Sequence, residues 1–172
     1  FLVTRIRNAR GLRRFCKVLL ALIFFQLIYG VLMAGHKAAA AAPTWPTING
    51  DWIPATLFKT SPWYLNLVEN TIMIHFIHRG LAYLIFLGIL LWTFRLFTSG
   101  LLRYERTKLI APLALVCFQI LLGVLTVLLS PGITANHWVF FDWIALLHQI
   151  TGMLLLLSLI YAVYVLRPAH AK

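Results

Sequence analysis

Four long apolar stretches constrain this chain more than any other feature of its sequence. They cover residues 18–34, 72–97, 109–129 and 143–166, and each is near the roughly 20 residues that a helix needs to cross the hydrocarbon of a bilayer. At 62% hydrophobic and 11% charged residues, a chain of 172 residues has too much apolar surface for one soluble core. We therefore expect an all-α integral membrane protein, a bundle of four transmembrane helices.

The basic residues gather at one end of this predicted bundle. Twelve of the 15 lysines and arginines precede the first span, lie at the end of the second span or between it and the third, or follow the fourth. The positive-inside rule places these segments, and so both termini, in the cytoplasm. Basic residues beside membrane spans favour contact with lipid headgroups. We therefore expect the lipid bilayer and no nucleic acid as a partner, despite the net charge of +11.

The chain divides into three parts on this interpretation. A basic cytoplasmic segment (1–17) leads into a four-helix membrane domain (18–166), and a short cytoplasmic tail (167–172) ends the chain. The outer loop (35–71) is rich in tryptophan and proline, which indicates an ordered lid. Its residues 54–67 are expected to form a short amphipathic helix that lies on the membrane.

Two motifs recur along the chain and suggest an internal repeat. Residues 25–32 (FQLIYGVL) match residues 118–125 (FQILLGVL) at five of eight positions, and His78 and His148 follow in the next span of each. Short apolar motifs often match by chance, but here the glutamine-glycine span precedes the histidine span both times. We interpret the bundle as two repeated helix hairpins related by duplication.

His78 and His148 each lie about one and a half turns inside the same end of a span. Ionisable residues inside a membrane are costly and usually functional. A single such histidine is more often an interhelical hydrogen-bonding group, but two neutral imidazoles at one depth are the ligand set of a bis-histidine haem. We therefore predict haem b, with His78 and His148 as its iron ligands. Closely packed helices leave no room for a porphyrin, so the helices must splay, or small residues must make room.

Two neighbours of His78 are further candidates for the cofactor site. His75 precedes it by three residues on the same helix face, so it either lines the pocket, holds a haem propionate or replaces His78 as ligand. Arg79 lies inside the span, where a propionate, Glu69 or Asp142 would neutralise it unless its head reaches the membrane surface. Zinc is a weaker interpretation, because the sequence offers no compact cluster of three or four ligands.

The outer loop and the later spans carry an ordered string of short motifs. They are MAG (33–35), TWPTING (44–50), IP (53–54), LF (57–58), PW (62–63), Asn66, EN (69–70), FIHR (76–79), QILLG (119–123) and LLHQ (146–149). In these motifs residues 16–168 resemble the second half of haem A synthase.

The resemblance implies eight transmembrane helices in two similar four-helix halves, and oxidation of a methyl group of haem O to the formyl group of haem A. It implies that His78 and His148 are the axial ligands of haem b in the C-terminal half, whereas the substrate haem lies in the other half. That half carries a glutamate three residues before its His-Arg pair. The corresponding position here is His75, where second halves of the family carry glutamine. The catalytic residue is therefore unknown, and the expected role of this chain is electron transfer through a bis-histidine haem.

The resemblance also implies partners and a location. We expect the chain to work with an N-terminal half of the same protein or as a homo-oligomer, and to depend on haem O supply and the cytochrome oxidase assembly machinery. The bacterial inner membrane is the expected location, ahead of the mitochondrial inner membrane, because no transit peptide is visible. Two alternatives remain open: a stand-alone four-helix b-type cytochrome that only carries electrons, and a haem-free membrane subunit whose histidines are packing residues.

Overall fold

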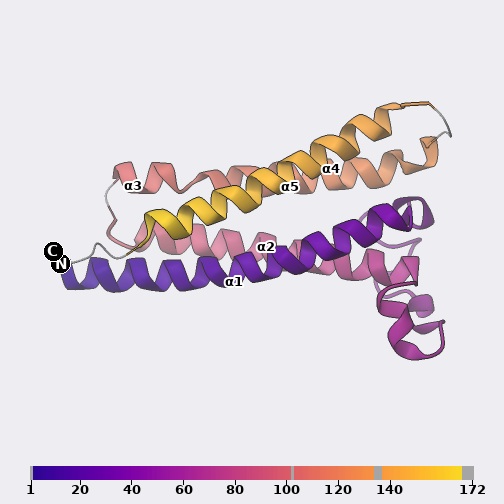
Figure 1. Ribbon diagram of the computed structural model, residues 1–172, viewed down its shortest axis with the longest axis horizontal. Helices are drawn as coiled ribbons and strands as arrows, with labels where there is room; N and C mark the ends of the chain where they lie inside the picture. Colours follow the sequence, from indigo (N-terminus) through magenta and orange to yellow (C-terminus); the bar gives the residue numbers. More distant parts are fainter. Residues whose placement is uncertain (1, 102, 134–136, 168–172) are drawn as a thin grey trace.

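The computed structural model describes residues 2–101, 103–133 and 137–167, and these form helices joined by loops. Four helices within these ranges are long and apolar enough to cross a membrane. They are α1 (Leu2–Gly35), α2 (Thr71–Thr98), α4 (Ala111–Leu129) and α5 (Phe140–Val165) (Figure 1). The described residues contain no strand beyond one isolated bridge in the outer loop. The prediction of an all-α bundle with four membrane-spanning helices is confirmed.

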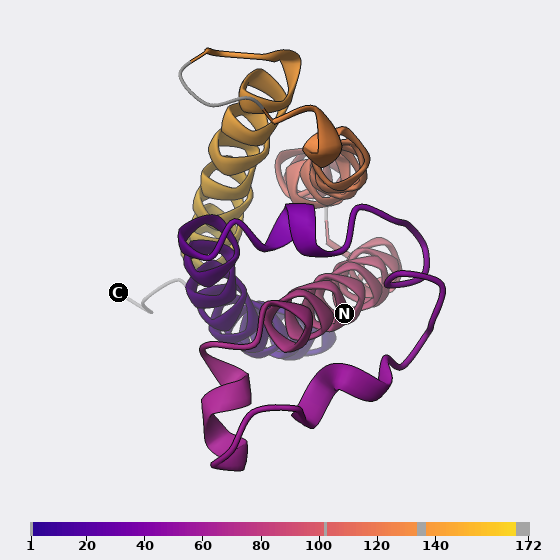
Figure 2. The ribbon, with the colours of Figure 1, turned by 90° about the vertical axis from the view of Figure 1, so that its right-hand side faces the viewer.

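The four long helices form a ring. The most extensive contacts join α1 to α2 and α4 to α5, and smaller ones join α1 to α5 and α2 to α4. The view along the bundle shows α2 and α5 at opposite corners of this ring (Figure 2). Both helices begin at the end that carries the outer loop and run toward the end where α1 begins (Figure 1). The two predicted histidine helices are therefore diagonal partners with the same direction.

The apolar core lies in the half of the bundle that is remote from the outer loop. Leu19 of α1, Trp92 of α2 and Leu159 of α5 are all fully buried there. The indole nitrogen of Trp92 donates a hydrogen bond of 3.0 Å to the main-chain oxygen of Leu12, which joins α2 to α1. Toward the outer loop the α1–α2 pair and the α4–α5 pair diverge (Figure 1). The four helices are thus tied together at one end and spread at the other.

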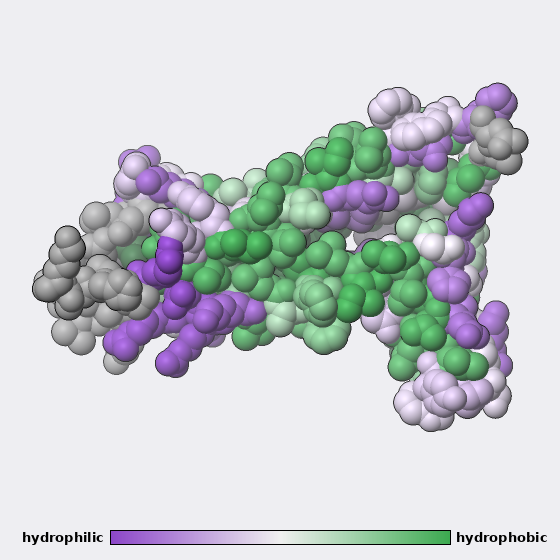
Figure 3. Space-filling view, in the orientation of Figure 1, coloured by the Kyte–Doolittle hydropathy of each residue, from purple (hydrophilic) through white to green (hydrophobic). Residues whose placement is uncertain are grey.

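The helices extend beyond the predicted apolar spans. Residues 2–17 of the predicted basic segment belong to α1, which begins at Leu2, because arginine is a good helix former and apolar patterning does not mark where a helix starts. After α2 the chain turns at Gly100, whose φ of 76° suits glycine, and forms the short α3 (Arg103–Lys108). On the face shown in Figure 3, apolar residues predominate in the middle of the molecule and hydrophilic residues gather at both ends. Of the predicted tail, residues 168–172 lie outside the described residues.

The outer loop contains three short 3₁₀ helices, η1 (Ala38–Ala41), η2 (Ala55–Phe58) and η3 (Trp63–Leu67). The expected single amphipathic helix over 54–67 is thus replaced by two short turns. Pro62 disfavours a helical conformation of the residue before it, and Asn66 stabilises the break. Its side-chain amide accepts from the main-chain nitrogen of Thr60 at 2.9 Å and donates to the oxygen of the same residue at 2.7 Å.

Side-chain amides also join the loop to the bundle. The Asn70 side chain accepts from the main-chain nitrogen of Ile72 at 3.1 Å, which caps α2. Its amide nitrogen donates to the main-chain oxygens of Thr56 and Leu57. At the other pair of helices, the Ser130 hydroxyl after α4 lies 2.7 Å from the main-chain oxygen of Val127 and 3.0 Å from that of Ala39 in η1, so it shares its hydrogen between the two acceptors. The loop therefore contacts both helix pairs at the end where they diverge.

Candidate functional site

The imidazole of His148, on α5, contacts a glutamine of the neighbouring helix α4. Its Nδ1 lies 3.1 Å from the main-chain oxygen of Gln119. Since a carbonyl oxygen only accepts, Nδ1 carries the proton and donates it, and the ring lone pair is left on Nε2. The side-chain amide nitrogen of Gln119 lies 3.3 Å from that Nε2 and donates to it. His148 is therefore held in the tautomer whose Nε2 can bind a metal.

The imidazole of His78, on α2, has a similar partner on α1. The side-chain amide nitrogen of Gln26 lies 3.3 Å from its Nδ1 and 3.2 Å from its Nε2. The Gln119 main-chain carbonyl accepts a hydrogen bond from His148, but among the described residues no main-chain carbonyl accepts one from His78. The orientation of His78 thus depends on one side-chain amide.

A glycine one helical turn after each glutamine makes room for the facing imidazole. A Cβ atom on Gly123 would lie 3.0 Å from Cε1 of His148, closer than side chains normally pack, and one on Gly30 would lie 3.7 Å from Cε1 of His78. Residues four apart share a helix face. We call the resulting sets the two Gln–Gly–His groups: Gln26, Gly30 and His78 between α1 and α2, and Gln119, Gly123 and His148 between α4 and α5.

The two Gln–Gly–His groups lie at similar depth in the half of the bundle where the helix pairs diverge. His78 is seven residues into α2 and His148 eight residues into α5, roughly 10 and 12 Å along the helix axes. Both imidazoles are partly buried. The two predicted ligands therefore lie at similar depth on diagonal helices of the ring (Figure 2).

Several observations bear on whether these residues fit a haem. The side-chain oxygens of Gln26 and Gln119 are buried and have no hydrogen-bond partner among the described residues, which is uncommon for buried polar atoms. The α1–α2 and α4–α5 pairs diverge at this end of the bundle (Figure 1), as a porphyrin between them would require. In the described part of the chain no group of three or more His, Cys, Asp or Glu side chains could hold a metal ion, whereas a haem iron takes only two ligands from the protein. The residues fit a bis-histidine haem better than a zinc ion.

Arg79 binds the outer loop. Its five N–H donors all have acceptors: Nε donates to Nε2 of His75 at 3.3 Å, and the two terminal nitrogens donate to four loop carbonyl oxygens at 2.6–3.3 Å. These carbonyls belong to Ala42, Thr44, Pro46 and Thr47. A charged group with all its donors satisfied is stable at partial burial. Arg79 therefore holds residues 42–47 against α2.

This arrangement differs from the partners expected for Arg79. Asp142 accepts from the main-chain nitrogen of Val139 at 2.8 Å at the start of α5, and the Glu69 side chain is exposed. His75 is fully buried, and its Nδ1 has no partner in the described residues. Its Nε2 faces Arg79, whereas His78 faces α1. The two histidines of α2 thus belong to different contact sets, and a contact of His75 or Arg79 with a propionate stays a prediction.

Comparison with known proteins adds evidence of another kind. The family model for COX15-CtaA, described as cytochrome oxidase assembly protein, matches residues 3–160. The chain belongs to this family. This confirms the resemblance inferred from the loop motifs.

Curated proteins similar to this member of the COX15-CtaA family carry the name Heme A synthase. The chain is 37% identical to one from Beijerinckia indica subsp. indica over 153 residues, which cover 87% of this chain and 40% of that protein. It is 32% identical to one from Brucella suis and 31% identical to one from Brucella ovis, each over 121 residues that cover 70% of this chain and 34% of the relative. The chain therefore spans well under half the length of these relatives. No solved structure matches it.

Sequence reasoning on this COX15-CtaA chain singled out the histidines but gave no role to Gln26 and Gln119. Each is the only amide side chain in its predicted apolar span, and each precedes a glycine of the repeat motif by four residues. That spacing places amide and glycine on one helix face. A polar side chain on the same helix face as a glycine, where another helix can approach closely, could have indicated a contact with the histidine helix.

Proposed function

We propose that this chain is the haem-b-binding part of a haem A synthase, the membrane oxidoreductase that converts haem O to haem A for cytochrome oxidase assembly. Family membership and the names of the relatives support this activity. The observation that carries the cofactor assignment is the matched pair of Gln–Gly–His groups at one depth on diagonal helices.

In this proposal His78 and His148 would hold the haem iron through their Nε2 atoms. Haem b, when bound, supplies one-electron transfer. The Gln119 carbonyl fixes the tautomer and the ring plane of His148 by accepting its Nδ1 proton. Gln26 orients His78, and for this its side-chain amide would turn so that the unpartnered oxygen accepts from Nδ1.

Arg79 binds the outer loop, and His75 accepts one of its hydrogen bonds. By holding residues 42–47 against α2, Arg79 keeps the loop over the end of the bundle that carries the histidines. Such a cover limits the access of water to the site. Neither residue is a carboxylate, so we assign the catalytic acid to another part of the assembly, either an N-terminal half or a second copy.

The proposed setting is the bacterial inner membrane. The relatives compared here are bacterial, and the basic end of the bundle, with both termini, would face the cytoplasm by the positive-inside rule. The Gln–Gly–His groups then lie toward the outer face. Their equivalent contacts support the proposal that α1–α2 and α4–α5 are duplicated hairpins.

Complementation in a bacterium that lacks haem A synthase tests this function. The chain would be expressed alone and together with the N-terminal half of the Beijerinckia relative, and extracted haems would be separated chromatographically. We expect haem A only from the combination, and its loss in His78→Ala and His148→Ala. Haem b bound to the chain without any haem A in the combination would instead favour a stand-alone cytochrome, and absence of bound haem would favour a haem-free subunit.

A further inference from the structure

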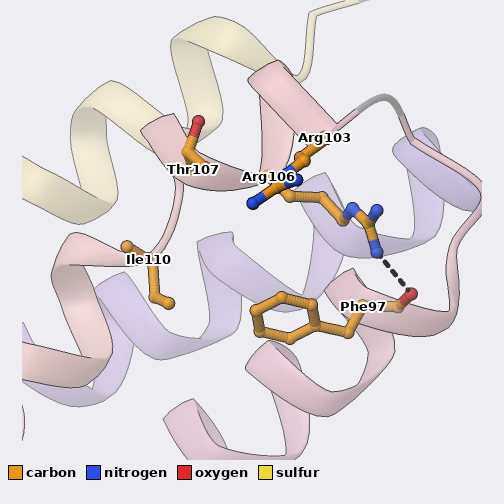
Figure 4. Close-up of a pocket in the computed structure, with 5 residues that line it drawn as sticks. All are labelled: Phe97, Arg103, Arg106, Thr107 and Ile110. Carbon is orange, nitrogen blue, oxygen red and sulfur yellow. Dashed lines mark hydrogen bonds between the residues drawn. The ribbon is translucent and has the colours of Figure 1, made fainter.

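A basic pocket of about 460 Å³ lies at the end of the bundle remote from the histidines. It is lined by Phe97 from the end of α2, by Arg103, Arg106 and Thr107 of α3, and by Ile110 at the start of α4 (Figure 4). Its volume lies within the roughly 300–1,000 Å³ that is usual for small-molecule pockets. The pocket is therefore large enough to hold a ligand of moderate size.

The charges that line this pocket are all positive. The Arg106 guanidinium donates through Nη1 to the main-chain oxygen of Phe97 at 3.2 Å and lies over the Phe97 ring. Its Nε is buried and has no partner among the described residues. Arg103 is exposed and makes no hydrogen bond or ion pair to any side chain that the structure describes. The pocket thus combines the Arg106 guanidinium, which is held in place and has one N–H donor without a described partner, with the exposed Arg103 guanidinium, which has no described partner.

The position of the pocket indicates what kind of anion it takes. Phe97 lies in the last turn of the span Thr71–Thr98, and Arg106 and Ile110 lie in the first turns of the span Arg106–Gly132. The lining therefore sits where the membrane meets water, with an aromatic and an aliphatic wall beside two cations. A ligand that complements both the cations and the apolar side chains carries a phosphate group attached to an apolar group.

We propose that this pocket binds the headgroup phosphate of an anionic phospholipid. Guanidinium groups form paired hydrogen bonds with phosphate oxygens, and basic pockets between transmembrane helices are known to take anionic headgroups. Arg103 and Arg106 contact the phosphate, while Phe97 and Ile110 contact the glycerol and the first methylenes of the acyl chains. A bound lipid would link α2, α3 and α4 at the corner where the chain turns.

Native mass spectrometry of the detergent-purified chain tests this site. Dioleoyl phosphatidylglycerol and dioleoyl phosphatidylcholine are titrated separately, and inorganic phosphate is added to the phosphatidylglycerol complex as a competitor. Since each cation in direct contact with an anionic headgroup contributes on the order of a fivefold change in binding, we expect Arg103→Gln and Arg106→Gln, which line the pocket, each to weaken phosphatidylglycerol binding about fivefold. Arg10→Gln, an exposed arginine of α1 at the same end, is the matched control and should bind as the unchanged chain does.

Three results would overturn the proposal. Equal retention of the two lipids would mean that the pocket does not select an anionic headgroup. Displacement of phosphatidylglycerol by inorganic phosphate at equal concentration would make the pocket a site for free phosphate. Unchanged binding in Arg103→Gln would also refute it, and this variant is informative even if Arg106→Gln disturbs α3, because Arg103 has no described partner to lose.

Discussion

Replacement of Gln26 by leucine should disturb His78 more than the corresponding change at Gln119 disturbs His148, because the two histidines differ in their hydrogen bonds. The described contacts of His78 with hydrogen-bonding groups all go to the side-chain amide of Gln26. His148 has one contact to the side chain of Gln119 and one to its main-chain oxygen. Gln26→Leu therefore removes every orienting bond of His78, whereas Gln119→Leu leaves His148 with its main-chain acceptor.

The size of the difference follows from the number of bonds that are lost. Loss of a group that orients a metal-binding histidine typically weakens metal binding about 10- to 100-fold, which corresponds to roughly 1.4–2.7 kcal/mol. We expect haem binding in Gln26→Leu to weaken within that range. In Gln119→Leu only an interhelical side-chain bond is lost, worth about 0.6 kcal/mol in a membrane, so binding should weaken less than about fivefold.

Titration of the haem-free, detergent-purified chain with haem, followed by Soret absorbance, measures both affinities. Gln149→Leu provides the control, because Gln149 is exposed on α5 beside His148 and has no part in either Gln–Gly–His group. An unchanged affinity in Gln26→Leu would refute the reasoning, and so would a larger loss in Gln119→Leu than in Gln26→Leu.

Three further substitutions test separate contacts. Gly123→Ala should lower the haem content of the purified chain more than Gly30→Ala, since the added Cβ would lie 3.0 Å from the facing imidazole in the first case and 3.7 Å in the second; equal haem contents would contradict this. Arg79→Gln should raise hydrogen exchange of the bonded amides of Ala42, Ile48 and Asn49 at least about tenfold, as it loses charge-assisted bonds worth about 1.5–3 kcal/mol each, and unchanged protection measured by mass spectrometry would count against the anchoring role. Trp92→Phe removes the hydrogen bond that joins α2 to the main-chain oxygen of Leu12, so the free energy of unfolding should fall by about 0.5–1.5 kcal/mol while haem content stays the same; a loss of haem alone would be inconsistent with its place in the core.

The sequence predicts the helices and the histidine pair because both depend on local patterns. An apolar run of sufficient length implies a span wherever it lies, and the depth of His78 or His148 follows from counting residues along a helix. The residues at which the helices begin are predicted less accurately. The histidine helices α2 and α5 begin at Thr71 and Phe140, slightly before the apolar runs that mark them.

The partners of Arg79 are outside the reach of such patterns. Its acceptors are main-chain oxygens of residues 42–47, more than 30 positions earlier in the chain. Every residue type supplies a carbonyl, so the amino-acid sequence does not distinguish these four from others. Only the loop conformation, in which the Thr44 hydroxyl donates to the main-chain oxygen of Thr47 and the Asn49 side-chain amide donates to that of Ala41, brings them to the guanidinium.

The central claim is that His78 and His148 together hold one haem iron. A reduced-minus-oxidised visible spectrum of the detergent-purified chain, recorded for the unchanged protein and for His78→Ala, His148→Ala and His75→Ala, tests it most directly. We predict a low-spin b-type spectrum that is lost or becomes high-spin in the first two variants and persists in His75→Ala, because Nε2 of His75 faces Arg79. A low-spin spectrum that survives in His78→Ala or in His148→Ala would contradict the account.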